Sequence, residues 1–412
     1  MRRRRYRWYC VVHFGGGANS GSFSGTRDLQ PALVSNSGDQ APSTWRFCPS
    51  KAVLLTWAEA DCAQCFAPWK SVRPPSRFRP PLLHQKHQGL SNRYATSMKA
   101  LVYRRYGMPI EVARVEDSQV PAPARGQVLV RVRYASVNPI DWKLMGGHLR
   151  LLTKQRLPRG VGTEFSGEIV EAGESISVRV GDTVVGFLDP FKDPTNAMAE
   201  YVLAPAGNVC AIPQGIGVDE ASALPVAGIA GLQMCRLGQI SAGQHVLVNG
   251  AAGGVGTMAA QIAHHLGAKI CATASSSNQE HLSTLRVDRS IDYSNVPVSR
   301  WPTPFDVILD CVGNLSPSAL RVLLRKGGRY ISAVPSFPGF VFENVLNRLR
   351  DNKYQTLFLA PGLDDLRTLL KMVADGQLQV HVAREFPLER AAEALELSRM
   401  GHARGKTVIR VA

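Results

Sequence analysis

Two kinds of hydrophobic pattern divide the chain from residue 98 onward. Gln127–Ala135 is apolar at every second position, which is typical of a strand with one buried face. Further on, Val246–Val248 is continuously apolar and Met258–Leu266 repeats apolar residues at helical spacing. The sequence therefore predicts a β-rich part followed by a part in which strands and helices alternate.

The β-rich part is expected from Met98 to about residue 220. Asp219 is the expected N-cap of a helix over residues 219–223. The predicted strands share short alternating patterns bounded by turns, and they are Lys99–Arg105, Ile110–Val115, Gln127–Ala135, Val161–Gly173, Thr183–Gly186, Ala199–Leu203 and Cys210–Ile212.

The α/β part follows to about residue 362. Its alternation of strands and helices predicts a doubly wound parallel sheet, the Rossmann fold. Beyond it, two helices and a terminal strand are expected, at Leu363–Gly376, Phe386–Met400 and Lys406–Val411. Within it, strands are expected at Val246–Val248, Lys269–Ala274, Val307–Asp310 and Arg329–Val334, with helices at Met258–Leu266 and Ala319–Arg325.

Size and composition fit a two-domain globular protein. A chain of 412 residues can bury a large core. Hydrophobic residues make up 45% and charged residues 19%, and no apolar run is long enough to span a bilayer.

Residues 1–97 differ from the rest in charge and pattern. They hold 14 of the 48 Lys and Arg residues but 4 of the 32 Asp and Glu, and they show no sustained periodicity. We expect a disordered leader, because Arg-rich, Ser-containing, acid-poor leaders are typical of organelle transit peptides. The alternative is that translation starts at Met98. The Cys62 and Cys65 pair has no second pair at zinc spacing and is interpreted as a chance feature of this leader.

The turn after Val246–Val248 is the strongest candidate for a ligand site. It reads A-x-G-x-x-G and opens a helix, so unpaired backbone N–H groups at that helix N-terminus can bind a phosphate. An ordinary Gly/Ala-rich turn is the alternative. The residues expected to contact a dinucleotide here are Ala251, Gly253, Gly254, Val255 and Gly256.

The end of the next predicted strand bears on which dinucleotide is bound. An NAD site usually places an acid there for the ribose 2′-hydroxyl, but residues 274–278 contain none. Hydroxyl and amide groups, with Ser276 among them, can instead hydrogen-bond a 2′-phosphate. The sequence therefore predicts NADPH over NADH, with a solvated loop as the alternative.

Several short motifs occur in an informative order: Ser136–Lys143, Gly162–Gly167, Val180–Asp182, Ala223–Gly228, Gly250–Gly256, Ile291–Tyr293, Asp310–Gly313 and Gly405-Lys406. In this combination the chain from Met98 onward resembles the medium-chain dehydrogenase/reductase superfamily. It resembles most the zinc-free quinone oxidoreductase (zeta-crystallin-like) branch. Asn138–Lys143 and Gly401–Lys406 are similar to the plant chloroplast-envelope quinone oxidoreductase homologues and their alkenal/enone-reducing relatives.

The resemblance implies a GroES-like β-rich domain over residues 98–220 and 363–412. A Rossmann NADPH-binding domain is implied over residues 221–362. Asn278 lies where many relatives carry a phosphate-binding lysine, and Tyr293 matches their phosphate-contacting tyrosine.

The zinc-binding members of the superfamily hold their catalytic zinc with Cys and His ligands. Here Asn138 and Asp141 occupy the stretch of the first ligand, and no cysteine is near. Zinc favours thiolate and imidazole ligands. The sequence therefore predicts no metal, which disfavours the alternative of an alcohol dehydrogenase.

A reductase without a metal ion needs protein groups that stabilise the negative charge on the substrate oxygen. Hydride transfer to the β-carbon of an enone, or to a quinone, develops charge on that oxygen, and hydrogen-bond donors or a cation stabilise it. Asn138 and Lys143 are the candidates, with Asp141 orienting Lys143 or a water. The alternatives are that Asn138-Pro139 is only a turn, that Asp141 caps the following helix and that Lys143 is solvated.

Further cofactor contacts are expected at the carboxyl ends of the parallel strands, where ligands bind in doubly wound sheets. Lys406 precedes the final strand, where the relatives approach the cofactor. The residues at the strand ends are Cys311, Gly313, Val334, Phe358 and Leu359.

These observations predict an NADPH-dependent quinone oxidoreductase or enone (alkenal) reductase. The alternative is a nucleotide-binding protein of the zeta-crystallin type with little catalysis. The expected partner is a small enone, alkenal or quinone and no nucleic acid, because basic–aromatic clusters are missing from the body. Peripheral membrane association and a monomer or homodimer are compatible with the resemblance. A chloroplast location follows from the leader, and a cytoplasmic one from a start at Met98.

Overall fold

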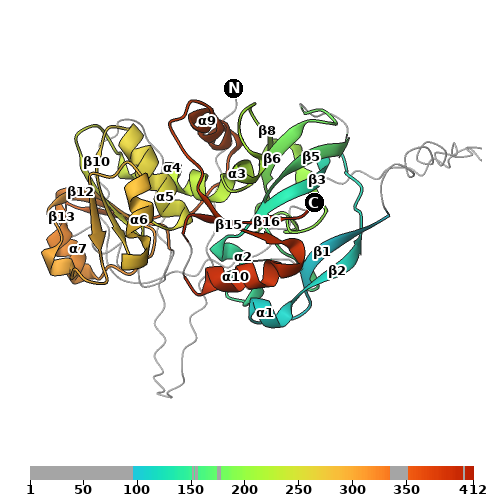
Figure 1. Ribbon diagram of the computed structural model, residues 1–412, viewed down its shortest axis with the longest axis horizontal. Coiled ribbons are helices and arrows are strands. Elements are labelled where there is room, and N and C mark those ends of the chain that lie inside the picture. Colours follow the sequence, from blue (N-terminus) through green and yellow to red (C-terminus); the bar gives the residue numbers. More distant parts are fainter. Residues whose placement is uncertain (1–95, 151–152, 154–155, 174–177, 335–350, 402–403) are drawn as a thin grey trace, which may run out of the picture. The chain divides into compact units, whose positions relative to one another are not determined.

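The computed structural model describes residues 96–412 apart from 151–152, 154–155, 174–177, 335–350 and 402–403 (Figure 1). Residues 1–95 of the predicted leader, with Cys62 and Cys65, lie outside the described residues. The predicted end of the leader at residue 97 is wrong, because Ser97 already begins a strand.

The α/β part forms a six-stranded, fully parallel sheet of order β11-β10-β9-β12-β13-β14. Its strands run in the Rossmann order 3-2-1-4-5-6, which confirms the doubly wound prediction. The order reverses between β9 and β12, so a crevice for ligands is expected at the carboxyl ends of these two strands. The strands are β9 (His245–Asn249), β10 (Lys269–Ala274), β11 (Arg289–Asp292), β12 (Phe305–Asp310), β13 (Leu324–Ser332) and β14 (Lys353–Thr356).

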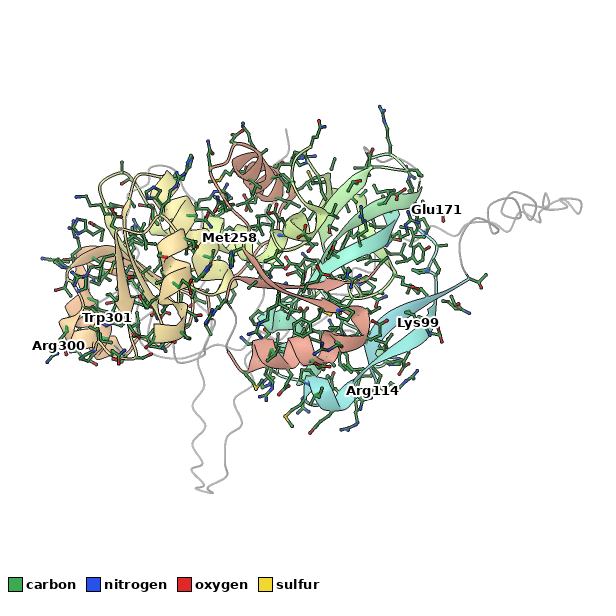
Figure 2. The ribbon with its side chains drawn as sticks, viewed as in Figure 1. Lys99, Arg114, Glu171, Met258, Arg300 and Trp301 are labelled. Carbon is green, nitrogen blue, oxygen red and sulfur yellow. The ribbon has the colours of Figure 1, made fainter. Side chains whose placement is uncertain are left out.

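Helices connect these strands. Met258 of α5 is buried, and its side chain lies against Gly231 of α4 (Figure 2). Glycine at 231 lets the two helices approach closely, because a Cβ atom there would lie 2.9 Å from the backbone nitrogen of Ala259. The helices are α4 (Pro225–Gly238), α5 (Gly254–His265), α6 (Gln279–Thr284) and α7 (Pro317–Leu323), with short 3₁₀ turns at Ser276–Asn278 and Val298–Arg300.

The β-rich part contributes a seven-stranded sheet and a three-stranded sheet. In the larger sheet the order is β15-β16-β3-β5-β6-β8, with β7 pairing β3, and in the smaller it is β2-β1-β4. The strands are β1 (Ser97–Tyr103), β2 (Ala113–Gln119), β3 (Gln127–Ser136), β4 (Arg159–Gly160), β5 (Glu164–Ala172), β6 (Thr183–Phe187), β7 (Tyr201–Pro205), β8 (Val209–Ala211), β15 (Val382–Pro387) and β16 (Lys406–Arg410).

The last strand returns to the first sheet. Val408 of β16 pairs with Ser136 of β3 in antiparallel register, although 272 residues separate them along the chain. The remaining helices are α1 (Pro109–Val112), α2 (Pro139–Met145), α3 (Val218–Ser222), α9 (Leu363–Ala374) and α10 (Ala391–Arg399), with 3₁₀ turns at Ala206–Asn208 and Leu388–Arg390. The return matches the predicted C-terminal part of a GroES-like domain, and the boundaries at 220 and 362 stay predictions.

Three local predictions are wrong. Residues 110–112 belong to the helical turn α1, because Pro109 favours the first position of a helix, and the strand begins at Ala113. Gly217 rather than Asp219 is the N-cap of α3, and Asp219 lies in the first turn. Phe386 belongs to β15, so the predicted helix over 386–400 begins only at Ala391.

The buried apolar residues of α9 connect it to α4. Leu366, Leu369 and Leu370 are almost fully buried, and Leu369 lies against Gly228.

Within the described residues, no helix has both the length and the apolar content needed to cross a bilayer.

Candidate functional site

The glycine turn lies at the carboxyl end of β9, where the sheet order reverses. Gly250 has a φ of +78°, a left-handed conformation that favours glycine, and Gly253 is the N-cap of α5 without a side-chain cap. A Cβ atom on Gly256 would lie 2.2 Å from the Gly250 carbonyl oxygen. The first N–H groups of α5 have no acceptor within the helix, so the turn leaves donors for a phosphate.

A buried polar network fixes the strand ends beneath this turn. Asp310 is fully buried and accepts hydrogen bonds from Asn249 Nδ2 at 2.8 Å and from the backbone N–H of Gly313 at 2.8 Å. Thr273 Oγ1 donates to Asn249 Oδ1 at 2.8 Å and accepts from the N–H of Gly250 at 2.9 Å. Side chains of β9, β10 and β12 thus hold the turn in place.

The segment before β16 crosses the glycine turn. The N–H of Gly405 donates to the Ala252 carbonyl at 2.8 Å, and Gly405 forms a bridge with Gly253. A Cβ atom on Gly254 would lie 2.8 Å from Lys406 Cδ, so glycine leaves room for the lysine side chain. The chain's last strand therefore brings Lys406 against the start of α5.

Lys406 ends in a buried cluster with two polar residues of the β-rich part. Its Nζ donates to Asn138 Oδ1 at 2.7 Å, to Glu164 Oε1 at 2.8 Å and to the Val137 carbonyl at 3.1 Å. Lys406, Asn138 and Glu164 are 4%, 3% and 0% exposed. The second oxygen of Glu164 accepts the N–H of Val226, in the first turn of α4, at 2.6 Å.

These contacts determine how the Asn138 amide is oriented. Its oxygen faces the Lys406 ammonium, and its nitrogen donates to Glu164 Oε1 at 2.6 Å. An amide nitrogen carries two N–H groups, so one remains for another acceptor. The ammonium of Lys406 has three N–H groups, and all three are used within the protein. In this cluster Asn138 is thus the residue with a donor to spare.

Asp141 and Lys143 are placed differently from the predicted arrangement. Asp141 Oδ2 accepts the backbone N–H of Asn138 at 2.8 Å and so caps α2, as the alternative interpretation of Asp141 predicted. Lys143 Nζ lies 5.5 Å from the centre of the Trp142 ring. The expected pairing of Asp141 with Lys143 is therefore wrong, and the lysine that contacts Asn138 is Lys406.

The residues predicted to contact a 2′-phosphate lie around the end of β10. Ser276 is exposed and Tyr293 is 52% exposed. The segment 274–278 has no acid, but the neighbouring strand supplies one, because Asp292 of β11 stands in register with Ala274. Ser276 Oγ donates to Asp292 Oδ2 at 2.6 Å. The segment 274–278 thus contains no acid, but the adjacent strand brings the carboxylate of Asp292 to the same edge of the sheet.

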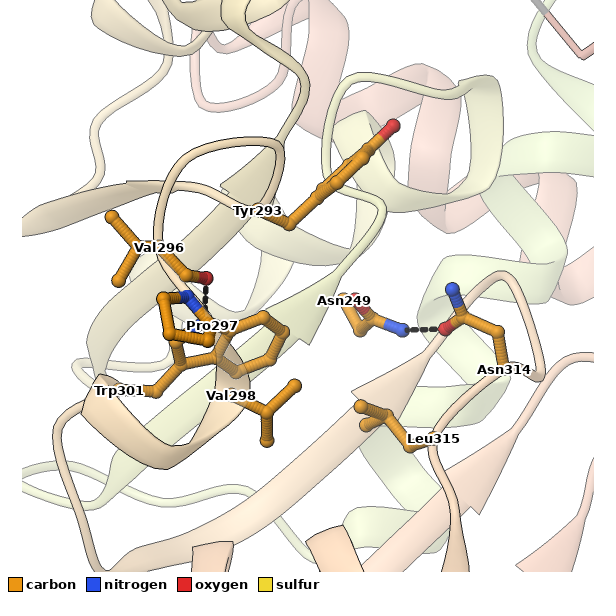
Figure 3. A pocket seen from close by; sticks show the side chains of 8 residues that line it. All are labelled: Asn249, Tyr293, Val296, Pro297, Val298, Trp301, Asn314 and Leu315. Atoms are coloured by element: carbon orange, nitrogen blue, oxygen red, sulfur yellow. Dashed lines mark hydrogen bonds between the residues drawn. The ribbon is translucent and has the colours of Figure 1, made fainter.

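A cavity of about 230 Å³ opens beside these residues (Figure 3). Asn249 Nδ2 donates to Asn314 Oδ1 at 2.8 Å across one side, and the Trp301 indole donates to the Val296 carbonyl at 2.9 Å on the other. Tyr293 lines the cavity as well, and Figure 3 shows its ring pointing away from the other lining residues. The cavity lining is polar at the strand ends and apolar elsewhere, with Val296, Pro297, Val298, Trp301 and Leu315 on the apolar side.

The other predicted cofactor residues follow the strand ends. Gly313 has a φ of +76°, and a Cβ atom on it would lie 2.9 Å from Val334 Cβ, so these two residues are neighbours. Burial raises the pKa of the Cys311 thiol, which therefore stays uncharged. Phe358 is 69% exposed, beyond the end of β14, and Leu359 is half-buried. Val255 lies in the first turn of α5, and Ala251 is fully buried beneath the turn.

Sequence reasoning missed four residues of this region: Asn249, Glu164, Asp292 and Asp310. Asn249 and Asp310 end two parallel strands. A polar residue directly after an apolar strand is a signal in the sequence that could have identified both. Glu164 belongs to the Gly162–Gly167 motif, and its buried partners Val226 and Lys406 are distant in sequence. No group of three or more His, Cys, Asp or Glu side chains that could hold a metal ion occurs among the described residues.

The Rossmann order, the glycine turn and the crevice at the switch point define a dinucleotide-binding protein. Two family models match the chain: "Alcohol dehydrogenase GroES-like domain" over residues 124–214 and "Zinc-binding dehydrogenase" over residues 285–409.

Similar proteins cover nearly all of the described residues. The chain is 29% identical to the "Chloroplast envelope quinone oxidoreductase homolog" of Arabidopsis thaliana over 76% of its length and 98% of that protein. It is also 29% identical to the Arabidopsis "NADPH-dependent alkenal/one oxidoreductase, chloroplastic", over 76% and 79%. The solved quinone oxidoreductase of Coxiella burnetii is 31% identical, with a TM-score of 0.72, over 77% of this chain and 100% of that one. The chain belongs to the medium-chain dehydrogenase/reductase superfamily and is an oxidoreductase that uses a nicotinamide cofactor.

Proposed function

We propose that this protein is an NADPH-dependent reductase of α,β-unsaturated carbonyl compounds or quinones that works without a metal ion. The observation that carries the proposal is the buried Asn138 amide, which Lys406 and Glu164 orient beside the glycine turn. The names of the two Arabidopsis relatives support the choice of quinone and enone substrates and of NADPH.

The residues present fit a nicotinamide dinucleotide. The first N–H groups of α5 would hold the pyrophosphate, and the cavity beside Tyr293 and Trp301 has the size and apolar lining for an aromatic base. Ser276, Asn278 and Tyr293 would face the 2′-phosphate. When bound, the nicotinamide supplies the hydride for the reduction.

The chain's own residues would stabilise the oxygen of the substrate. Charge grows on this oxygen as the β-carbon of an enone, or a quinone, is reduced, and a preorganised donor in a water-poor site stabilises it. The free N–H of Asn138 is that donor. The Lys406 cation stabilises the same charge through space, and Glu164 keeps both residues in place. A proton from solvent then adds to the α-carbon of the enolate, or to the oxygen of the quinol anion, and completes the reduction.

The cluster explains how the reaction proceeds with a hydrogen-bond donor in place of a Lewis acid. A carbonyl oxygen becomes more basic as it acquires charge, so a hydrogen bond to it strengthens in the transition state. Asn138 is held on both of its polar atoms, so its orientation costs little at that moment.

The location in the cell is part of the same proposal. The Arabidopsis relatives named above are described as chloroplast proteins, which supports a plastid location alongside the Arg-rich leader. Other similar proteins are named mitochondrial, so import of a tagged full-length chain is the measurement that separates the two organelles.

The test is an NADPH-oxidation assay with a small enone, a quinone and no acceptor, before and after dialysis against a chelator. We expect acceptor-dependent turnover that survives chelation. Asn138→Ala is expected to lower kcat by about 100-fold, the effect of removing one oxyanion donor. NADPH oxidation at the same rate with and without an acceptor would contradict the proposal. Loss of turnover on chelation, with recovery on addition of zinc, would contradict it as well.

A matched variant checks that the effect is local. Asn352 is a partly buried asparagine whose amide hydrogen-bonds the backbone of β13 at Arg325 and Gly327, so Asn352→Ala removes a similar group elsewhere. We expect its kcat to equal that of the wild type. If Asn138→Ala also kept full kcat, the donor role would be refuted.

A further inference from the structure

The carboxylate of Asp292 stands beside the strand end at which Rossmann folds generally distinguish the two nicotinamide dinucleotides. In a Rossmann fold the ribose 2′ position lies at the end of the second strand, which is β10 here. Asp292 ends the neighbouring strand β11 and is paired with Ala274, the last residue of β10. The sequence places these two residues 18 positions apart, but the parallel register places them side by side.

Three hydrogen bonds hold this carboxylate at the edge. Oδ2 accepts from Ser276 Oγ at 2.6 Å and from Asn295 Nδ2 at 2.7 Å, and Oδ1 accepts from the N–H of Ser294 at 2.9 Å. The bond from Ser276, followed by those from Ser294 and Asn295, lowers the pKa of Asp292, so the side chain is charged at neutral pH.

The same contacts reduce what Ser276 can offer to a phosphate. A hydroxyl has one hydrogen, and Ser276 gives it to Asp292, while its oxygen accepts from Asn295 Nδ2 at 3.2 Å. Ser276 therefore presents no free donor in this arrangement. Asn278, at the position where the relatives' lysine is expected, brings no positive charge.

We propose that Asp292 is a specificity-determining residue that opposes the 2′-phosphate and admits a ribose 2′-hydroxyl, so that the protein binds both NADPH and NADH. This inference rests on the proposed use of a nicotinamide dinucleotide at this edge of the sheet. Two negative groups a few ångströms apart repel, whereas Oδ1 retains a lone pair for a hydroxyl donor. The carboxylate thus sets how strongly the chain prefers the phosphorylated cofactor.

The experiment compares direct binding of NADP⁺ and NAD⁺ to the full-length wild type and to Asp292→Asn, by calorimetry without any acceptor. The variant keeps the shape and an acceptor oxygen but removes the charge. We expect the ratio of Kd for NAD⁺ to Kd for NADP⁺ to rise about fivefold, the scale of one exposed charge pair. An unchanged or lower ratio would overturn the inference.

Two further variants separate the local charge from other effects. Asp117→Asn removes an exposed carboxylate of β2, in another sheet, and is expected to leave the ratio unchanged. Asn278→Lys adds the missing cation, and its gain for NADP⁺ is expected to be larger in the Asp292→Asn background, where no carboxylate competes for it. Equal gains in both backgrounds would also overturn the inference.

Failure of the proposed function would look different. If the wild type preferred NAD⁺ outright, the NADPH assignment would fail while the rise in ratio for Asp292→Asn still supported the role of Asp292. If 2′,5′-ADP and 5′-AMP bound equally to wild type and variant, the role of Asp292 would fail while reductase activity remained.

Discussion

Replacing Lys406 by Met tests how the buried cluster works. The ammonium is 4% exposed and its partner Glu164 is fully buried, so the variant leaves a carboxylate buried without its cation. Removing one member of a buried ion pair costs about 3–5 kcal/mol of the free energy of unfolding. Because domains are stable by about 5–15 kcal/mol, Lys406→Met is expected to fold with a clearly lower midpoint in urea.

The effect on catalysis follows from the same contacts. Asn138 Oδ1 loses its donor from Lys406, which leaves only the bond to Glu164 to orient the amide. We expect kcat to fall by about tenfold or more, since misplacing an oxyanion donor approaches the effect of deleting it. The Kd for NADPH is expected to change little, because all three N–H groups of Lys406 are used within the protein.

A double-mutant cycle supplies the decisive measurement. Glu164→Gln removes the carboxylate charge, so in the double variant no buried charge is left alone, and stability is expected to recover by about 2 kcal/mol relative to Lys406→Met. As a control, Lys371→Met breaks the exposed Lys371–Asp375 pair of α9 and is expected to cost about 0–1 kcal/mol. Additive effects of Lys406→Met and Glu164→Gln, or a cost below that of the control, would refute the assignment.

Three more variants probe the site. Burial raises the pKa of Asp141 to about 7, so the folded protein holds a proton that the unfolded chain releases, and the free energy of unfolding falls as pH rises from about 4 to 7. Asp141→Asn removes this titration and is expected to shrink the difference in Tm between pH 5 and pH 8. An unchanged difference would argue against a protonated Asp141. Gly256→Ala places a Cβ atom 2.2 Å from the Gly250 carbonyl oxygen, so the turn must shift. The variant is expected to bind NADPH at least about tenfold more weakly in a fluorescence titration, and normal affinity would contradict the turn as the phosphate site. Lys143→Met is expected to lower kcat less than Lys406→Met does, because Lys143 lies over Trp142; the reverse order in steady-state kinetics would restore Lys143 to the mechanism.

Local patterns were sufficient for most of the elements and for the glycine turn. The alternation in Gln127–Ala135 predicted β3, and the apolar run followed by small residues predicted β9, the turn and α5. Hydrophobic periodicity reports which face of an element is buried, and that information lies within a few consecutive residues. At Phe386 the pattern failed, because an apolar residue at the end of a strand extends the helical periodicity of the following segment.

The electrostatic partners could not be predicted in the same way. The sequence singled out both Asn138 and Lys406 but assigned them to different tasks, since 268 residues separate them. Their contact depends on β16 pairing with β3 and on Gly405 crossing the turn, which are long-range events. Lys143 was the nearer lysine in sequence, and the geometry of α2 directs it to Trp142 instead.

Cofactor selectivity shows why the neighbouring strand has to be considered. An acid at the end of β10 would have been visible in the sequence, and its absence favoured NADPH. In a parallel sheet, however, the residue that ends the adjacent strand reaches the same edge, and Asp292 does so in register with Ala274. A 2′-phosphate encounters the charge at a point in space, whichever strand supplies it. In the proposed cofactor site, the discrimination between NADPH and NADH therefore depends on the balance between the Asp292 carboxylate and the hydrogen-bond donors at 276–278, and Asp292→Asn changes one side of that balance alone.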